Sequence, residues 1–247
     1  MSRYTGTELA LFSAAANWKS YLKRQIRPYL GGDVLEVGAG IGGTTMSLCE
    51  ERGGRWVCLE PDPELAAALV ESRNAGAVPA RCEVIVGTAD SARGLTPFDT
   101  ILYIDVLEHI EDDAEEVRKS AGLLAPGGHL VVLSPAHPWL FTPFDRAIGH
   151  HRRYTRRSLR ALTTPDLEVA LVRYLDAAGL VASLGNRVIL KSSMPTRRQI
   201  AVWDNGLVTL SRFLDPVLGF GLGKSILGIW RKRAIADAAN SGKSSSS

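Results

Sequence analysis

Short apolar segments alternate with helical patterns along most of this chain. Each apolar segment is rich in Val, Ile and Leu and is followed by apolar positions at helical spacing and then by a turn. Strands that follow one another through intervening helices lie parallel in one sheet, with helices on both faces. The pattern therefore predicts strands at 33–38, 55–60, 82–86, 100–104, 129–134, 167–174 and 225–230.

Residues that commonly cap helices mark the starts of the helices between these strands. Asp62 is followed by Pro63, a pair typical of the first positions of a helix. Asp112 or Asp113 begins the helix after the fourth strand, and Thr155 begins a short helix after the fifth. Each start follows a predicted strand, as the alternating pattern requires.

The stretch between the last two predicted strands is too long for a simple connection. It contains two helical patterns, at 180–190 and 203–213, whereas connections in compact domains are usually a few residues long. We therefore expect it to form a helical cap over the binding face of the sheet. The predicted organisation is an N-terminal helical segment at 1–32, a core at 33–174 and 225–233, the cap at 175–224 and a disordered, serine-rich tail at 234–247.

Composition indicates a soluble globular protein. Of the 247 residues, 45% are hydrophobic, and the formal net charge is only +3, so we expect no nucleic-acid partner. The three cysteines lie in apolar runs, as reduced core residues of cytoplasmic proteins do. The chain start lacks a signal-peptide pattern, and four prolines interrupt the longest uncharged stretch, 120–144. We expect a cytoplasmic monomer or homodimer without stable membrane insertion.

A glycine-rich turn follows the first predicted strand. Gly38, Gly40 and Gly43 allow the backbone to turn sharply and a ligand to approach closely. Glu60 ends the second strand about twenty residues further on, where a carboxylate accepts hydrogen bonds from ribose hydroxyls. These two features suit a nicotinamide dinucleotide and S-adenosylmethionine equally.

Later motifs separate the two cofactors. Five motifs follow one another in order, at 36–42, 57–60, 86–90, 98–110 and 123–130. With this order and spacing, the chain from about residue 30 to 135 resembles the class I S-adenosylmethionine-dependent methyltransferases, and within them the ubiquinone-pathway O-methyltransferase group. A set of ordered motifs is far more specific than one glycine-rich turn.

The resemblance implies a fold, a cofactor and a set of contacts. The fold is α/β, a Rossmann-like seven-stranded, mostly parallel sheet whose last strand is antiparallel, and the cofactor is S-adenosyl-L-methionine. Gly38 and Gly40 would contact its methionine half, Glu36 would fix the loop, and Glu60 would hold the ribose. The residues implied to bind the cofactor are Glu36, Gly38, Ala39, Gly40, Glu60, Pro61, Ala89, Asp90, Tyr103, Ile104, Asp105 and Val106.

Three of the five histidines follow the fifth predicted strand, where an open α/β sheet binds its ligands. His150 or His151 is the expected general base or acceptor-orienting residue, because a neutral imidazole takes a proton near pH 7. Asp105, beside the methyl group, is the third predicted catalytic residue, with a role as a helix cap as its alternative. The predicted acceptor contacts are His137, Arg153 and Tyr154.

The same loop allows other interpretations. It is also consistent with a charged surface loop, and His137, Asp145, His150 and His151 would permit a metal site. No regular ligand spacing appears, so no metal is expected.

These observations predict an enzyme that transfers a methyl group from S-adenosylmethionine to a small-molecule acceptor, hydrophobic or lipid-like, most simply at oxygen. The alternatives are a methyltransferase-fold enzyme with another chemistry, an NAD-dependent oxidoreductase and a non-catalytic binding subunit. The apolar residues of 175–224, with a helix around 12–21, are expected to form a lid that admits the acceptor. Packing on the sheet or a dimer face would explain the same residues.

Overall fold

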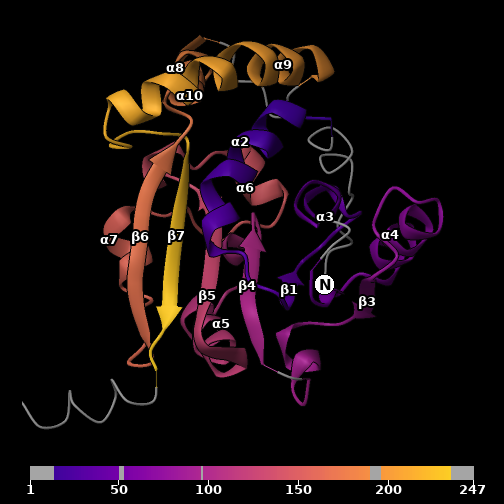
Figure 1. The fold of residues 1–247 in the computed structure, drawn as a ribbon. Coiled ribbons are helices and arrows are strands. Elements are labelled where there is room, and N and C mark those ends of the chain that lie inside the picture. The colour runs from indigo at the N-terminus through magenta and orange to yellow at the C-terminus, as the bar shows by residue number, and fades with distance from the viewer. Residues whose placement is uncertain (1–13, 50–52, 96, 190–195, 235–247) are drawn as a thin grey trace, which may run out of the picture.

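The strands form one seven-stranded sheet in the order β3-β2-β1-β4-β5-β7-β6 (Figure 1). The computed structural model describes residues 14–49, 53–95, 97–189 and 196–234. Only β7 runs antiparallel to its neighbours, β5 and β6. This confirms the predicted fold class. The strands are β1 (Val34–Val37), β2 (Trp56–Glu60), β3 (Cys82–Val86), β4 (Phe98–Ile104), β5 (Leu124–Pro135), β6 (Leu167–Leu175) and β7 (Ser225–Lys232).

The predicted strands agree closely with these bounds, except at β5. Every residue of β1 and β2 is buried, as expected for central parallel strands covered on both faces. The Pro126-Gly127-Gly128 segment precedes the predicted strand at 129–134, but it lies inside β5. Gly127 adopts a φ of +81°, and the pairing with β4 shifts in register between Phe98 and Thr100. A glycine-dependent irregularity thus lets the strand continue through a turn-like sequence.

Helices cover both faces of the sheet. Core side chains of α5 and α7 pack on one face, and those of α2, α4 and the cap pack on the other. Asp62, Asp112 and Thr155 cap α4, α5 and α7, as predicted. The helices outside the cap are α2 (Ala16–Ile26), α3 (Gly43–Leu48), α4 (Pro63–Asn74), α5 (Asp113–Leu123), α6 (Pro143–Ala147) and α7 (Arg156–Arg160), with 3₁₀ turns η1 (Arg27–Tyr29), η2 (Ala89–Ala92), η3 (Leu107–His109) and η4 (Pro138–Leu140).

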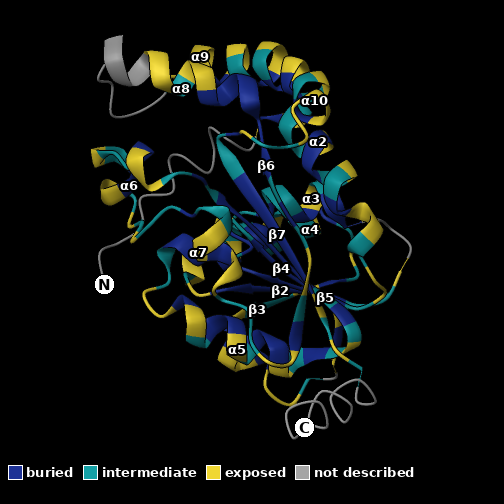
Figure 2. Ribbon diagram, turned by 90° about the vertical axis from the view of Figure 1, so that its left-hand side faces the viewer, coloured by how far each residue is buried: buried dark blue, intermediate teal, exposed yellow. Residues whose placement is uncertain are grey.

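The cap forms a helical layer beyond one edge of the sheet (Figures 1 and 2). It contains α8 (Ala177–Ile189), α9 (Arg197–Val202), the π-helical turn η5 (Trp203–Leu207) and α10 (Val208–Val217), rather than two helices. Hydrogen bonds join α2 to this layer: Tyr21 donates to Asp215, and Asp204 accepts from the backbone amides of Asn17 and Trp18. The predicted tail lies, apart from Ala234, outside the described residues. Within the described segments, no helix is long and apolar enough to cross a bilayer.

Candidate functional site

The ends of five strands meet at the edge of the sheet beneath the cap. The registers align Val37 with Leu59 and Tyr103, and Ile104 with Leu133, so β1, β2, β4 and β5 end together. Because β7 is antiparallel, it begins at this edge, where Ser225 pairs with the end of β5. The loops that follow the parallel strands and precede β7 therefore surround one site.

The glycine-rich turn lies at this edge and needs its glycines. Gly38 and Gly40 have φ values of +70° and +57°, a region that side chains disfavour. A Cβ on Gly38 would lie 2.6 Å from a Cγ of Val106. The amides of Gly38 and Ala39 both donate to the Leu59 carbonyl, at 2.8 and 3.0 Å. The turn is thus held tightly against the end of β2.

Hydrogen bonds to Glu60, at the end of β2, also hold the turn in place. Its buried carboxylate accepts hydrogen bonds from the amides of Gly40 and Asp62, at 2.7 and 3.0 Å. Burial raises the pKa of Glu60, while these two bonds oppose the rise. Pro61, which follows, is exposed at the same edge. A glycine turn with an acidic residue at the next strand end fits the adenosyl and methionine parts of S-adenosylmethionine.

Glu36 is buried behind the turn and bonds within the protein. Its carboxylate accepts hydrogen bonds from the Thr45 hydroxyl and the Trp56 indole, at 2.8 and 2.9 Å. Burial raises its pKa to about 7. These contacts tie α3 and β2 to β1, an arrangement that suits the loop-fixing role predicted for Glu36.

The predicted cofactor contacts Ala89 and Asp90 lie in η2, where Ala89 is buried and Asp90 is exposed. The Asp90 carboxylate pairs with Lys119 and Arg93, at 2.6 and 2.7 Å, and the Lys119 hydrogen bond lowers its pKa most. In this structure, therefore, the carboxylate is bonded toward α5. A cofactor contact by Asp90 stays a prediction.

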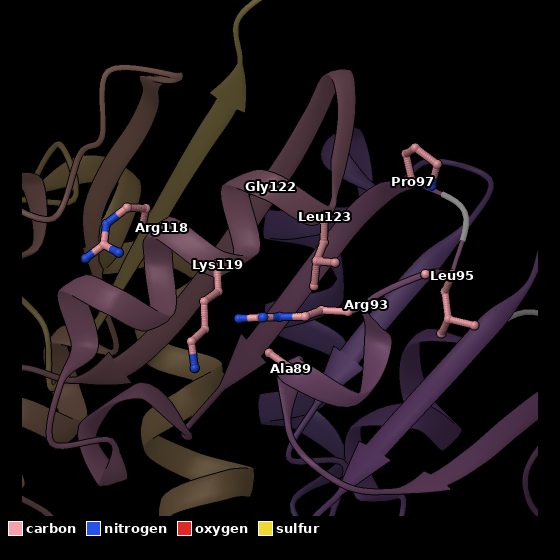
Figure 3. A pocket seen from close by; sticks show the side chains of 9 residues that line it. Ala89, Arg93, Leu95, Pro97, Arg118, Lys119, Gly122 and Leu123 are labelled. Carbon is pink, nitrogen blue, oxygen red and sulfur yellow. The ribbon is translucent and has the colours of Figure 1, made fainter.

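A pocket of about 390 Å³ lies between η2 and α5 (Figure 3). Three basic side chains contribute to its wall, but Arg93 and Lys119 pair with Asp90, and Arg118 pairs with Glu115. Each basic side chain therefore has a carboxylate partner, and Arg93 and Lys119 share theirs. Its lining residues are Ala89, Arg93, Gly94, Leu95, Pro97, Arg118, Lys119, Gly122 and Leu123.

The side chain of Tyr103, a predicted cofactor contact, is instead bonded within the core. Its ring is buried, and its hydroxyl bonds to Glu116 and Ser120 of α5, both at 2.8 Å. Side chains alternate between the faces of a strand, so the next residue, Ile104, packs on the other face. Val106, another predicted cofactor contact, lies against Gly38 of the glycine-rich turn.

Asp105 occupies the centre of this edge in a strained conformation. Its φ is +56°, unusual for a residue other than glycine, and its amide donates to the Leu133 carbonyl at 2.9 Å. The surrounding protein raises its pKa to about 6 by desolvation, against the opposing effects of His150 and Lys224, although the residue stays open to solvent. The turn η3 that follows has no side-chain cap, so the alternative role of Asp105 as a cap is wrong.

His150 faces this acidic region and is oriented by Asp145. Its Nδ1 lies 3.1 Å from Asp145 Oδ1, and its Nε2 lies 3.8 Å from Glu108 Oε1. Arg153 donates two hydrogen bonds to the same aspartate, at 2.8 and 2.9 Å. Burial alone would raise the pKa of Asp145, but the bonds from His150 and Arg153 hold it below its usual range. An ionised Asp145 favours the proton on Nδ1 and leaves Nε2 as the basic nitrogen.

The other predicted acceptor-loop residues lie in different surroundings. His151 is exposed, and its amide donates to the Glu108 carbonyl at 2.8 Å, so the two adjacent histidines point in different directions. His137 has a φ of +65° and stacks on Tyr174, with the ring centroids 4.7 Å apart. Its Nε2 lies 3.0 Å from the Gly223 carbonyl, which joins the loop after β5 to the segment before β7.

Arg153 and Tyr154 are structural in this arrangement, not acceptor contacts as predicted. The Arg153 guanidinium forms an ion pair with Asp145. Tyr154 is buried, and its hydroxyl donates to Asp113 at 2.7 Å. Burial and that bond raise the pKa of Tyr154, so its phenol stays neutral.

Lys224 is a residue of this edge that the sequence analysis missed. Its ammonium lies 5.2 Å from the centroid of the Trp203 ring in the cap. Burial lowers its pKa, whereas Asp176 and Asp105 raise it, so it is close enough to both carboxylates to interact. The antiparallel direction of the last strand was the signal available, since it brings the residue before that strand to the ligand-binding edge.

The fold also brings together three side chains that could hold a metal ion. Glu108, His109 and His150 each offer one ligand atom, and these atoms lie within 4.8 Å of one another. Glu108 Oε1 is buried without a hydrogen-bond partner. Burial lowers the pKa of His109 to about 4, so its ring is neutral near pH 7. The spacing rules used on the sequence could not reveal this cluster, because one ligand comes from a distant loop.

Comparison with known proteins agrees with the resemblance seen in the motifs. A family described as a methyltransferase domain matches residues 35–130. A ubiquinone biosynthesis O-methyltransferase of Xylella fastidiosa (strain 9a5c) is 33% identical over 114 residues, which cover 45% of each chain. The chain spans less than half the length of the curated relatives it matches.

Solved structures show the same fold over most of the chain. Coclaurine N-methyltransferase bound to N-methylheliamine and SAH has a TM-score of 0.59 and 15% identity, covering 86% of this chain and 72% of its own. The [4+2]-cyclase SpnF has a TM-score of 0.57 and 15% identity, covering 86% of this chain and 80% of its own. At such identities, the likeness shows the fold alone.

Proposed function

We propose that this chain is an S-adenosylmethionine-dependent methyltransferase that methylates an oxygen atom of a small-molecule acceptor, hydrophobic or lipid-like in character. The match of residues 35–130 to a methyltransferase domain supports this proposal. When bound, S-adenosylmethionine supplies a methyl group activated on a sulfonium. Gly38, Gly40 and Glu60 would hold it at the sheet edge. The carboxylate of Asp105 at this edge suits a neighbouring positive charge.

The His150–Asp145 pair is the observation that carries the choice of oxygen. A hydroxyl acceptor must lose a proton during methyl transfer, so a base beside it accelerates the reaction. The 3.1 Å contact of Nδ1 with Asp145 leaves Nε2 to take that proton. His150 also interacts electrostatically with Asp105, so base and cofactor site are near neighbours.

Aromatic side chains around the same edge favour a flat or hydrophobic acceptor. The ring of Trp139 is half exposed and lies 5.3 Å from His137, centroid to centroid. Trp203 faces Lys224 from the cap. Rings combined with a few polar groups are typical of pockets for phenolic or lipid-like molecules. We infer no nucleic-acid partner, because the net charge is small.

A methyltransferase-fold enzyme with another chemistry is the second candidate, since one solved structure of this fold is a [4+2]-cyclase. The His150–Asp145 pair favours methyl transfer over this alternative, because a pericyclic addition removes no proton.

Mass spectrometry with methyl-labelled S-adenosylmethionine tests the proposal. The acceptors are phenols with and without an isoprenoid tail, each paired with the amine of the same skeleton. We expect label on the phenols, more with the tail, and a product that the His150→Gln variant forms far more slowly. Label on the amines alone would overturn the choice of oxygen. Cofactor binding without label on any acceptor would favour the second candidate.

A further inference from the structure

Helix α10 presents its faces in the opposite sense to an ordinary surface helix. Its buried positions are Val208, Ser211 and Asp215, of which two are polar. The apolar residues Leu210, Phe213 and Val217 are exposed. Phe213 is 70% exposed and Val217 is 82% exposed. Surface helices normally turn apolar residues toward the core and polar residues toward water. An inverted helix of this kind therefore needs a partner for its outer face.

The inversion has a structural cause. Asp215 accepts hydrogen bonds from Tyr21 and from the amides of Asp176 and Ala177, which lead into α8. Ser211 accepts from the Ala178 amide and donates to Asp176. The polar face of α10 is thus used to bind α2 and α8. Its exposed apolar residues therefore lie on the opposite side of the helix.

The exposed apolar residues extend beyond α10. Residues spaced three or four apart along a helix share a face, so Leu210, Phe213 and Val217 form one stripe. Helix α8, which packs against α10, also exposes apolar side chains. We call this surface the outer cap face; its exposed apolar residues are Val181, Leu184, Val202, Leu210, Phe213 and Val217.

The acidic residues of the cap are buried, whereas some of its basic residues are exposed. The segment 176–224 contains three acidic residues, Asp176, Asp204 and Asp215, and all three are buried. Its described basic residues include Arg197 and Arg198, which are exposed at the start of α9. Arg198 lies one helical turn before Val202. In the described part of the segment, every exposed charged side chain is therefore cationic.

We propose that the outer cap face docks on the surface of an anionic lipid bilayer. An apolar helical stripe flanked by basic residues, with acidic residues excluded, is the pattern of helices that lie in the interface of such a bilayer. A symmetric dimer through the same face would bring like patches together. The exposed charges of both copies in the described part of the cap would then all be cationic, whereas lipid phosphates complement Arg197 and Arg198.

Docking of this kind would place the ligand edge of the sheet close to the bilayer, since the cap covers that edge (Figure 1). A lipid-like acceptor could then enter directly from the membrane. The docking itself needs neither cofactor nor acceptor, so it can be tested whether or not methyl transfer is found.

Vesicle co-sedimentation of the full chain tests the proposal. We expect the protein to sediment with vesicles of phosphatidylglycerol and phosphatidylcholine, less so at high salt, and to stay in solution with phosphatidylcholine alone. Phe213→Ser should lower the partition coefficient on the order of tenfold, because a large apolar group is lost from the interface. Reversing both charges, R197E with R198E, should lower it by a similar factor.

Two exposed residues outside the cap serve as controls. Val169→Ser on β6 removes one exposed apolar side chain and Arg118→Glu on α5 reverses one charge, and both variants should bind vesicles like the parent. Failure of the parent to bind anionic vesicles, or full binding by Phe213→Ser, would overturn the proposal. The proposal would also be overturned if the parent formed a dimer that does not bind vesicles and the Phe213→Ser variant were monomeric. The outer cap face would then be a subunit contact.

Discussion

The buried carboxylate of Glu60 accepts a hydrogen bond from the backbone amide of Gly40, with 2.7 Å between Oε2 and the nitrogen. Glu60 ends β2, and Gly40 lies in the turn after β1, so one bond joins two neighbouring strand ends. The residue predicted to hold the ribose therefore also shapes the loop predicted to hold the methionine half. A change at this one carboxylate should affect both parts of the cofactor site.

Replacing Glu60 by alanine should weaken binding of S-adenosylhomocysteine by about 1–3 kcal/mol, the usual loss for a carboxylate hydrogen-bond partner. Isothermal titration calorimetry measures the effect directly. Glu71→Ala, an exposed change on α4, is the matched control and should bind like the parent. Unchanged affinity in a folded Glu60→Ala variant would remove the proposed ribose and loop roles.

Alanine at His150 should slow turnover by roughly 10²- to 10⁴-fold, the range for loss of a general base. Alanine at His151 should have little effect, because that side chain is exposed and only its amide is used. Steady-state kinetics with a methylated acceptor separates the two, and calorimetry should show intact cofactor binding in both. Parental turnover of both variants would mean that neither histidine acts as the base and that this loop is a charged surface loop.

Tyr154→Phe should destabilise the fold by about 1–2 kcal/mol while leaving the KM for the acceptor unchanged. The variant removes a buried hydroxyl that donates to Asp113 at 2.7 Å, and a buried carboxylate loses a partner. Urea unfolding monitored by circular dichroism gives the free energy of unfolding. A raised KM with parental stability would instead support the acceptor contact predicted from the sequence.

Glu36 should make the protein less stable as the pH rises from about 4.5 to about 7. Burial raises the pKa of Glu36 from its ordinary value of 4.5 to about 7. The folded state therefore retains a proton that the unfolded state has lost, and the free energy of unfolding falls over that range by up to about 3 kcal/mol.

Glu36→Gln isolates this effect. The amide oxygen can still accept from Thr45 and Trp56, but the group no longer titrates. Urea unfolding at a series of pH values should show a smaller decrease for the variant than for the parent. Parallel pH profiles would mean that Glu36 ionises normally in the folded state.

Asp204→Ala should loosen α2 from the cap. Helix α2 has no side-chain cap of its own, and Asp204 accepts from the Asn17 and Trp18 amides, at 3.1 and 2.7 Å, as an N-cap residue would. The expected loss of stability is about 1 kcal/mol, with faster hydrogen exchange at those two amides. Asn205→Ala removes a contact with the Asn17 side chain and a bond to the Ala201 carbonyl, but no bond to the two amides, so it should leave their exchange near the parent rate.

The sequence by itself determined the elements and the cofactor edge of this protein. Strand and helix patterns depend on neighbouring residues, so β1 to β4, β6 and β7 and the caps at Asp62, Asp112 and Thr155 could be predicted from them. The glycine turn could be predicted for the same reason, because its positive φ angles restrict the residue type locally.

Tertiary structure alone decided which polar side chains face the site. Tyr103 and Tyr154 stand among predicted site residues, yet their hydroxyls are bonded in the core to Glu116 and Asp113. The edge instead gains Lys224, which is distant from the other site residues in sequence. Such placements depend on the direction of a strand or the side from which a helix packs, and no local pattern records either.

The cap shows the same limit most clearly. Its apolar residues were expected to line a lid, but Phe213 and Val217 lie on the outside, while Ser211 and Asp215 lie within. Hydrophobicity along the chain indicates that α10 has two faces, but not which one turns inward. That choice was made by the hydrogen bonds of Asp215 to Tyr21 and to the start of α8, which join segments far apart in the sequence.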